Sequence, residues 1–163
     1  MTRSGAAAPE RTNEAGALPG HEVRMTVPFH DLDPLQVVWH GNYMKYFDIA
    51  RQALFDSLEV DLYDIKARFG YVFPIIRQSV KHSHPLRHRD EFLCRARLVQ
   101  AARKIVVEFE VRLVDGTLCA RAVSEQAAVR VPDGKLCLKV PEPLAGMLQK
   151  AMDRAAGGAA ETE

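Results

Sequence analysis

The order of apolar patterns along the chain predicts an α+β domain, in which an antiparallel sheet curves around one long helix. One strand pattern comes first, a helical pattern follows it, and four further strand patterns then succeed one another without a helix between them. Strands that follow one another in this way favour antiparallel pairing, because parallel neighbours need a long crossover connection. At 163 residues, the chain has the usual length of one domain.

The first strand begins at His21, where apolar side chains start to alternate with polar ones up to Phe29. This period of two is typical of a strand with one buried face. A turn-forming run follows at residues 31–34. Residues 42–58 then carry large or small apolar side chains at intervals of three and four, namely Tyr43, Phe47, Ala50, Leu54 and Leu58. This spacing predicts an amphipathic helix of ordinary length.

The rest of the body is predicted to be mostly strand. A short helical segment at residues 62–69 comes first, because Gly70 follows it at the position of a C-cap glycine. The remaining strands are predicted at residues 72–82, 91–100, 105–114 and 118–131, with Asp115-Gly116 as a tight hairpin turn. With the first strand, they make a sheet of about five strands. Residues 141–155 are expected to form a final short helix.

The two ends of the chain differ in composition from its body. Residues 1–20 are rich in Ala, Gly, Pro, Glu and Arg, and they offer little apolar surface besides Leu18. We expect a flexible tail there, one domain over residues 21–150, and a second tail over residues 151–163. Because residues 1–20 contain no continuous apolar run, they read neither as a secretory signal nor as a membrane span, and the cytoplasm is the expected location.

The charge balance excludes partners that need a strong electrostatic field. Lys and Arg total 22 against 21 for Asp and Glu, which is a net charge of +1. Such a chain has no broad positive electrostatic field that could hold a nucleic acid.

Cys94, Cys119 and Cys137 are far apart and lie in apolar sequence without metal-type spacing, so we expect buried, reduced thiols.

The segment FHDLDPLQVVWHGNY at residues 29–43, followed by Phe47 and Ala50-Arg51, resembles the signature of the 4-hydroxybenzoyl-CoA thioesterase family. In that family the motif runs from the first strand, through a loop with an aspartate before Pro or Ala, to Asn-Tyr at the central helix. The resemblance implies a hotdog fold and hydrolysis of acyl-CoA or acyl-carrier-protein thioesters without a cofactor or metal. It also implies a homodimer with a continuous sheet, assembly into a homotetramer, and Asp33 as the catalytic carboxylate.

Thioester hydrolysis needs a group that attacks the carbonyl carbon and donors that stabilise negative charge on the carbonyl oxygen. An ionised Asp33 meets the first need, either as a nucleophile that forms a mixed anhydride or as a general base for water. Free N–H groups at the start of the helix meet the second, and the resemblance places them at Trp39-His40-Gly41. The His40 imidazole is expected to orient the substrate, although a helix-entry role is the alternative. Asp-x-Asp-Pro is also ordinary loop chemistry, so the surrounding motif decides for catalysis.

Five further residues have supporting roles in this interpretation. Gln36 stands where the family usually has glycine, so its side chain is expected to narrow the pocket or to contact the acyl chain. Asn42 is expected as an N-cap and Tyr43 as a core aromatic residue, with a pocket role as the lesser alternative for each. Arg103 and Lys104 lie where relatives contact the phosphates of CoA, but basic residues at a hairpin are also ordinary surface.

His82 and His84 share one strand face, as two ligands of a metal ion would. Since no Cys or spaced pair of carboxylates completes a site, a polar rim or a basic contact for the substrate is the favoured interpretation.

Two other functions on the same fold are alternatives to thioester hydrolysis. A hydratase or dehydratase would pair a His with an acid at the substrate β-carbon, which the Asp-Pro loop does not resemble. A non-catalytic acyl-binding or carrier-docking module is suggested only by Gln36.

Overall fold

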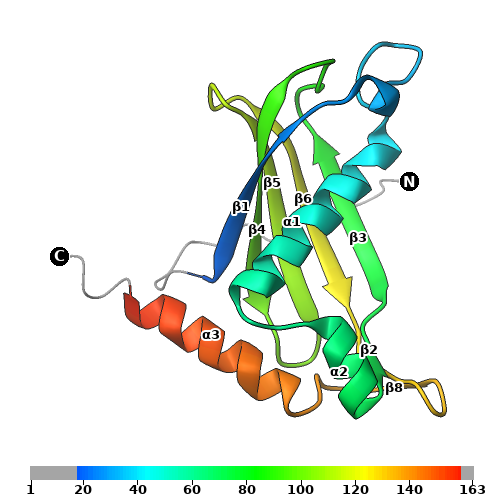
Figure 1. The fold of residues 1–163 in the computed structure, drawn as a ribbon, viewed down its shortest axis with the longest axis vertical. Coiled ribbons are helices and arrows are strands. Elements are labelled where there is room, and N and C mark those ends of the chain that lie inside the picture. Colours follow the sequence, from blue (N-terminus) through cyan, green and yellow to red (C-terminus); the bar gives the residue numbers. More distant parts are fainter. Residues whose placement is uncertain (1–17, 159–163) are drawn as a thin grey trace, which may run out of the picture.

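The computed structural model describes residues 18–158, which form a five-stranded antiparallel sheet wrapped around a long helix (Figure 1). The strand order is β1-β4-β5-β6-β3, and each neighbouring pair is antiparallel. The predicted α+β class and antiparallel sheet are therefore confirmed. The strands are β1 (Gly20–Thr26), β3 (Ile75–His82), β4 (Glu91–Gln100), β5 (Ile105–Leu113) and β6 (Leu118–Gln126).

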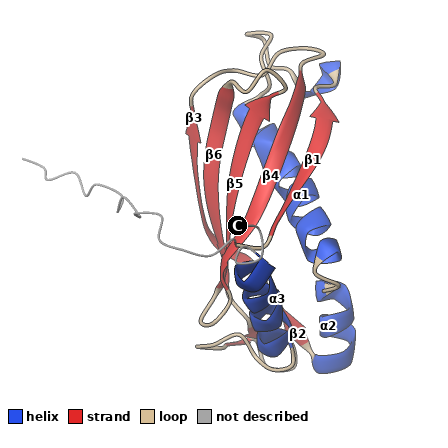
Figure 2. Ribbon diagram, turned by 90° about the vertical axis from the view of Figure 1, so that its left-hand side faces the viewer, coloured by secondary structure: helices blue, strands red, loops and turns tan. Residues whose placement is uncertain are grey.

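Helix α1 (Tyr43–Ser57) crosses one face of this sheet, and Figure 2 shows it on that side of the strands. The helix buries the apolar residues whose spacing predicted it, because they form a stripe along the side that faces the sheet. Phe47 has no exposed surface, and its ring lies 4.9 Å from the ring of Phe109 on β5, measured between centroids. The hydrophobic core thus lies between α1 and the inner face of the sheet.

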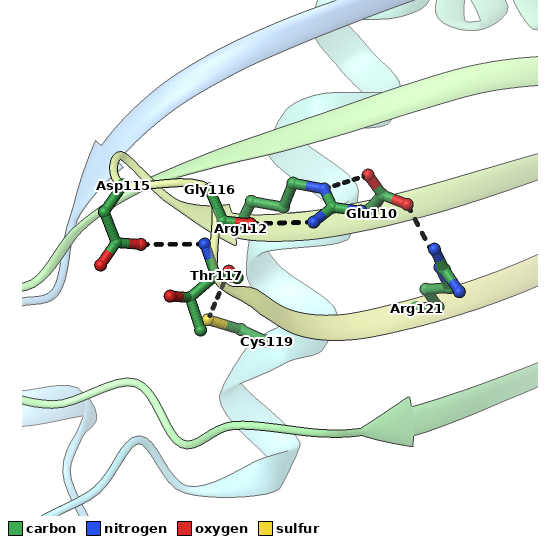
Figure 3. Close-up of polar contacts among 7 residues, drawn as sticks. All are labelled: Glu110, Arg112, Asp115, Gly116, Thr117, Cys119 and Arg121. Atoms are coloured by element: carbon green, nitrogen blue, oxygen red, sulfur yellow. Dashed lines mark hydrogen bonds and ion pairs between the residues drawn. The ribbon is translucent and has the colours of Figure 1, made fainter.

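The outer face of the sheet is charged, because the polar positions of each strand alternate with the buried ones. Arg97 on β4 pairs with Glu108 on β5 at 3.0 Å. Glu110 accepts hydrogen bonds from Arg112 and Arg121, as Figure 3 shows. Ion pairs of this kind across neighbouring strands support the register of the sheet, each by a fraction of a kcal/mol to about 1 kcal/mol.

The hairpin between β5 and β6 has the predicted turn residues. The Asp115 carboxylate accepts the N–H of Thr117 at 2.8 Å, and Gly116 takes a left-handed φ of 95° (Figure 3). Helix α2 (Leu62–Phe69) also ends as predicted, at Gly70 with a φ of 73°. Its first turn is capped by Asp61, whose side chain accepts the N–H of Tyr63 at 2.8 Å. The hairpin turn and the C-terminal glycine of α2 were therefore predicted correctly, whereas the Asp61 cap was not predicted.

Two predicted strands are each broken in two, which corrects the expectation of continuous strands at residues 72–82 and 118–131. The first is split by Phe73-Pro74 into β2 (Tyr71–Val72) and β3, and the second by Ala127-Ala128 into β6 and β7 (Val129–Arg130). A proline cannot donate to a strand ladder, which favours the first break. The short pieces form a separate sheet of order β2-β7-β8, with β8 at Lys135–Leu136. That small sheet was not predicted.

Helix α3 (Leu144–Gly158) has 15 residues, the length of the predicted final helix, but it begins and ends three residues later. It therefore includes residues 151–158 of the expected C-terminal tail, and Leu144, Leu148 and Ala151 form a buried stripe along it at helical spacing. The predicted tails at residues 1–17 and 159–163 lie outside the described residues. No helix within residues 18–158 has both the length and the apolar character needed to cross a bilayer.

The cysteines agree in part with the expectation of buried thiols. Cys94 and Cys119 are buried and free, whereas Cys137 is free and only half-buried. Burial raises the pKa of the Cys94 thiol to about 12, so this side chain behaves as a small apolar core residue.

Candidate functional site

A hollow of about 340 Å³ lies where the loop between β1 and α1 meets the end of β3. A carboxylate, three imidazoles and a tyrosine ring share its wall, so it combines groups that can attack, donate and accept. A larger hollow of about 520 Å³ lies over the outer face of the sheet, but its acidic residues, Glu108 and Glu110, are both paired with arginines. We therefore take the smaller hollow as the candidate site. It is lined by Asp33, Val37, Val38, His40, Tyr43, His82, Ser83, His84 and Pro85.

Asp33 is held at the wall of this hollow by a tight loop. Its Oδ1 atom accepts the N–H of Leu35 at 2.8 Å, its own N–H donates to the carbonyl of Val37 at 2.9 Å, and its carbonyl accepts the N–H of Gln36 at 2.9 Å. The other carboxylate oxygen has no hydrogen bond to any of residues 18–158. One oxygen thus orients the carboxylate and the other remains available to a bound molecule, as a catalytic role requires.

Gln36 has a left-handed φ of 61°. Glycine adopts this conformation without strain, which explains why a glycine is common at such a position. Gln36 adopts this left-handed backbone conformation despite its side chain, which is exposed and does not line the hollow. Within one chain the side chain therefore does not narrow the candidate site, so the expected effect of Gln36 on the pocket has no support here.

Free N–H groups lie just before the start of α1, at His40, which lines the hollow, and at the adjacent Gly41. A short 3₁₀ turn (His40–Asn42) leads into the helix, and the N–H of Asn42 donates to the carbonyl of Trp39 at 2.8 Å. Within the described part of the chain, the N–H groups of His40 and Gly41 have no hydrogen-bond partner. Unpaired donors at a helix start attract negative charge, so these two can stabilise an oxyanion.

Trp39 and Gly41 are coupled by packing. The Trp39 ring lies 5.2 Å from the His40 ring between centroids, and about half of the Trp39 surface is exposed. A Cβ atom at Gly41 would collide with this indole. Glycine at residue 41 thus lets the indole pack on the backbone, and a larger residue there would displace the indole; the backbone itself needs no positive φ.

Asn42 occupies the predicted N-cap position of α1, but its side chain makes no capping hydrogen bond. Its side-chain amide instead donates to the carbonyl of Asp31 at 2.9 Å, across the loop. Tyr43 is the core aromatic residue that was predicted, with only 2% of its surface exposed, yet it also borders the hollow. Burial raises the pKa of Tyr43 to about 12, so its phenol stays protonated and neutral.

His82 joins the site from the end of β3. Its ring meets the Tyr43 ring edge to face, with centroids 4.6 Å apart. Burial, with the nearby His40 as a smaller cause, lowers the pKa of His82 below its ordinary value of 6.5. This imidazole is therefore mostly neutral at pH 7. With His84, it lines the hollow, where the sequence favoured a polar rim or a basic contact for the substrate.

Among residues 18–158, no three His, Cys, Asp or Glu side chains are arranged to hold a metal ion.

Arg103 and Lys104 do not reach the hollow within one chain. They lie in the turn between β4 and β5, at the end of the sheet opposite to the loop that carries Asp33. Lys104 pairs with Glu125 on β6 at 2.7 Å. A contact with CoA at the hollow would require these residues from a second subunit, and the phosphate assignment stays a prediction.

Asp31 is the residue near the site that sequence reasoning missed, since it was taken only as part of a turn. Its surface is 1% exposed, and its carboxylate accepts hydrogen bonds from Lys45 and from the hydroxyl of Tyr46. Burial alone would raise the pKa of this carboxyl, but the two hydrogen bonds outweigh burial and hold the pKa below its ordinary value of 3.8. The partners are 14 and 15 residues away, so no short motif reveals them.

The lowered pKa of Asp31 predicts a pH dependence of stability. A carboxyl with a lower pKa in the folded state contributes stability above its unfolded pKa of about 4, and this contribution is lost as the pH falls through the folded value. We expect the free energy of unfolding of the wild type to fall more steeply below about pH 4 than that of Asp31→Asn. Urea denaturation at a series of pH values measures both slopes, and parallel curves would contradict the assignment.

The left-handed φ of Gln36 predicts that glycine stabilises the loop. That conformation costs a residue with a side chain about 1 to 2 kcal/mol, while glycine loses about 0.5 to 1 kcal/mol of chain freedom on folding. We expect Gln36→Gly to raise the free energy of unfolding by about 0.5 to 1 kcal/mol in denaturation experiments. Leu35→Gly is the control, because Leu35 is exposed and has no positive φ, and it should lower stability. Equal effects would show that Gln36 is not strained.

Comparisons with known proteins agree with this geometry. Residues 35–120 match the family model described as "Thioesterase superfamily", a range that covers more than half of the chain and begins two residues after Asp33. A protein of Synechocystis sp. named "Putative esterase sll0410" is 25% identical over 93 residues. That match covers 57% of this chain and 55% of the relative, so it spans about half of the relative's length.

Solved structures have the same fold. A DHNA-CoA thioesterase from Staphylococcus aureus superposes with a TM-score of 0.75 at 16% identity, covering 88% of this chain and 95% of that one. A mutant 4-hydroxybenzoyl CoA thioesterase, complexed with 4-hydroxybenzoyl CoA, gives 0.70 at 17% identity, covering 80% and 99%. The predicted hotdog fold and the resemblance to thioesterases are confirmed. Since the family model matches more than half of its length, the chain belongs to the thioesterase superfamily.

Proposed function

We propose that this chain hydrolyses acyl-CoA thioesters, with Asp33 acting at the carbonyl carbon. The observation that carries the proposal is that one hollow borders both the Asp33 carboxylate and the start of α1 at His40. A thioester seated there would have a carboxylate near its carbonyl carbon and N–H donors near its carbonyl oxygen. Membership in the superfamily supports this reaction class, and both solved relatives are named for CoA thioesters.

Asp33 can act by either of two mechanisms, as a general base or as a nucleophile. As a general base, it takes a proton from water while the water oxygen bonds to the carbonyl carbon, and collapse of the tetrahedral intermediate expels the CoA thiolate. As a nucleophile, its free oxygen bonds to the carbonyl carbon and displaces the thiolate, and water then hydrolyses the mixed anhydride. Both routes need one unpaired carboxylate oxygen, and the hydrogen bond from Leu35 leaves one.

The N–H groups of His40 and Gly41 would stabilise the oxyanion that forms in either route. They are unpaired within residues 18–158, and they sit at the positive end of α1. Removal of one donor of this kind raises the activation free energy of acyl transfer by about 2.7 to 4 kcal/mol. The neutral His82 and Tyr43 would border the substrate without adding charge beside the Asp33 carboxylate. The His40 imidazole would orient the thioester.

The thiol carrier and the alternative function are addressed by one assay. CoA and an acyl carrier protein present the same thioester, so hydrolysis of short, medium and aromatic acyl groups on each carrier identifies the preferred substrate. A non-catalytic acyl-binding module was suggested only by Gln36 in place of glycine. That reason is weakened, because Gln36 keeps a φ of 61° and its side chain lies outside the hollow. Tight acyl-CoA binding without turnover would favour the module.

Asp33→Asn should abolish most of the hydrolysis, because the amide is neither a base nor a good nucleophile. We expect kcat to fall by about 10² to 10⁴ with the preferred acyl-CoA, measured as release of free thiol. Asp61→Asn is the matched control: Asp61 accepts the N–H two residues ahead at 2.8 Å, as Asp33 does, but at the start of α2. Wild-type rates for Asp33→Asn would refute the assigned role.

We also propose that the chain forms a homodimer through the free edge of β3. This strand is an outer strand of the sheet, it exposes Ile75 and Ile76, and its last residue, His82, lines the hollow together with the three residues that follow it. A second subunit there would cover the open edge and close one side of the site. Light scattering should give twice the chain mass of 18.2 kDa, or four times for a tetramer. A monomer at every concentration would contradict the proposal.

A further inference from the structure

Asp31 is a buried carboxylate to which the proposed chemistry gives no part. Among the described residues, it is the only acidic residue that is fully buried. Burying a carboxylate is costly unless the carboxylate is paired and hydrogen-bonded, so such residues are uncommon in folded proteins. Asp31 lies two residues before Asp33, at the point where the loop of the candidate site begins.

The Asp31 side chain connects the loop to α1. Oδ1 is paired with the ammonium group of Lys45, and Oδ2 accepts the hydroxyl of Tyr46 at 2.6 Å. The Nε2 atom of His30 lies 3.8 Å from Oδ1. Lys45 and Tyr46 both belong to the first turn of α1. The carboxylate thus fixes the beginning of the loop against the beginning of the helix.

The Asp31 main chain connects the same point to the other end of the loop. Its carbonyl accepts the N–H of Trp39 at 2.9 Å and the side-chain amide of Asn42 at 2.9 Å. Trp39 immediately precedes His40, whose N–H group is one of the two proposed oxyanion donors. Both ends of the loop are therefore held by hydrogen bonds to a single residue.

We propose that Asp31 is a positioning residue for thioester hydrolysis, and this rests on the function proposed above. It fixes the separation between the Asp33 carboxylate, two residues ahead of it, and the N–H groups of His40 and Gly41, because its hydrogen bonds hold Trp39 and Asn42 on either side of those groups and Tyr46 on the helix. Catalysis requires these groups on opposite sides of one carbonyl, and a displacement of about 1 Å can reduce a rate about 10²-fold. Asp31 itself does not line the hollow.

Asp31→Asn tests this role with little change in shape. The amide keeps the carbonyl bonds to Trp39 and Asn42 and one side-chain acceptor, but it removes the charge that pairs with Lys45. Tyr46→Phe is a second variant, which removes one hydrogen bond to Asp31 while every residue of the loop keeps its identity. The matched control is Asp48→Asn, because Asp48 is an exposed acid on α1 whose ion pair with Arg51 lies within the helix.

The kinetic readout separates positioning from stability. We expect Asp31→Asn to lower kcat by about 10-fold to 100-fold with little change in KM, and Tyr46→Phe to act in the same direction with a smaller factor. Asp48→Asn should leave kcat unchanged. In an Asp33→Asn background, Asp31→Asn should cost much less than it does alone, because the carboxylate that it positions is already gone. Equal factors in both backgrounds would overturn the proposal.

Hydrogen exchange supplies a readout that does not depend on activity. The amide protons of residues 33–41 should exchange faster in Asp31→Asn, while those of the central strands β4 and β5 keep wild-type rates. Unchanged loop exchange, or a uniform increase throughout the protein, would show that Asp31 contributes only general stability. If the wild type hydrolyses no thioester but the loop alone exchanges faster, the proposed function fails and the positioning of the loop by Asp31 stands.

Discussion

The packing of α1 against the inner face of the sheet is the constraint on which the rest of the structure depends. Phe47 lies on Phe109, and the helix buries its apolar stripe across several strands, so its axis has one position relative to the sheet. The first turn of the helix carries Tyr43 and the partners of Asp31, and the 3₁₀ turn directly before it carries the proposed oxyanion donors. The core packing that stabilises the domain therefore also places one half of the candidate site.

The other half of the site is a short loop whose geometry comes mainly from its own main chain. Asp33 exchanges hydrogen bonds with Leu35, Gln36 and Val37, and these bonds impose the left-handed conformation on Gln36. Asp31 joins this loop to the helix. A polar connection of this kind is expensive to bury, but it specifies one relative position where apolar contacts would allow several. A second buried polar connection lies further along α1, where the Arg51 guanidinium donates to the Ser124 hydroxyl on β6 at 2.9 Å.

Much of the fold was predictable because its long elements repeat a simple period. Glu91–Gln100 was predicted with the observed bounds, and α1 to within one residue at each end. The strands β2, β7 and β8 were missed because two residues are too few to show any period. In the candidate site, Asp33 and His40 were found through a continuous motif. Asp31 was not, because its partners come from a different element and only folding brings them together.

The indole of Trp39 has a further consequence, since it is the only tryptophan in the chain. It sits over Gly41 and against the ring of His40, which lines the hollow, with half of its surface in solvent. The near-ultraviolet emission of the protein therefore originates almost entirely from one fluorophore beside the candidate site. Ligand entry would alter the polarity around this indole and the quenching of its emission, so occupancy of the site can be followed optically without a label.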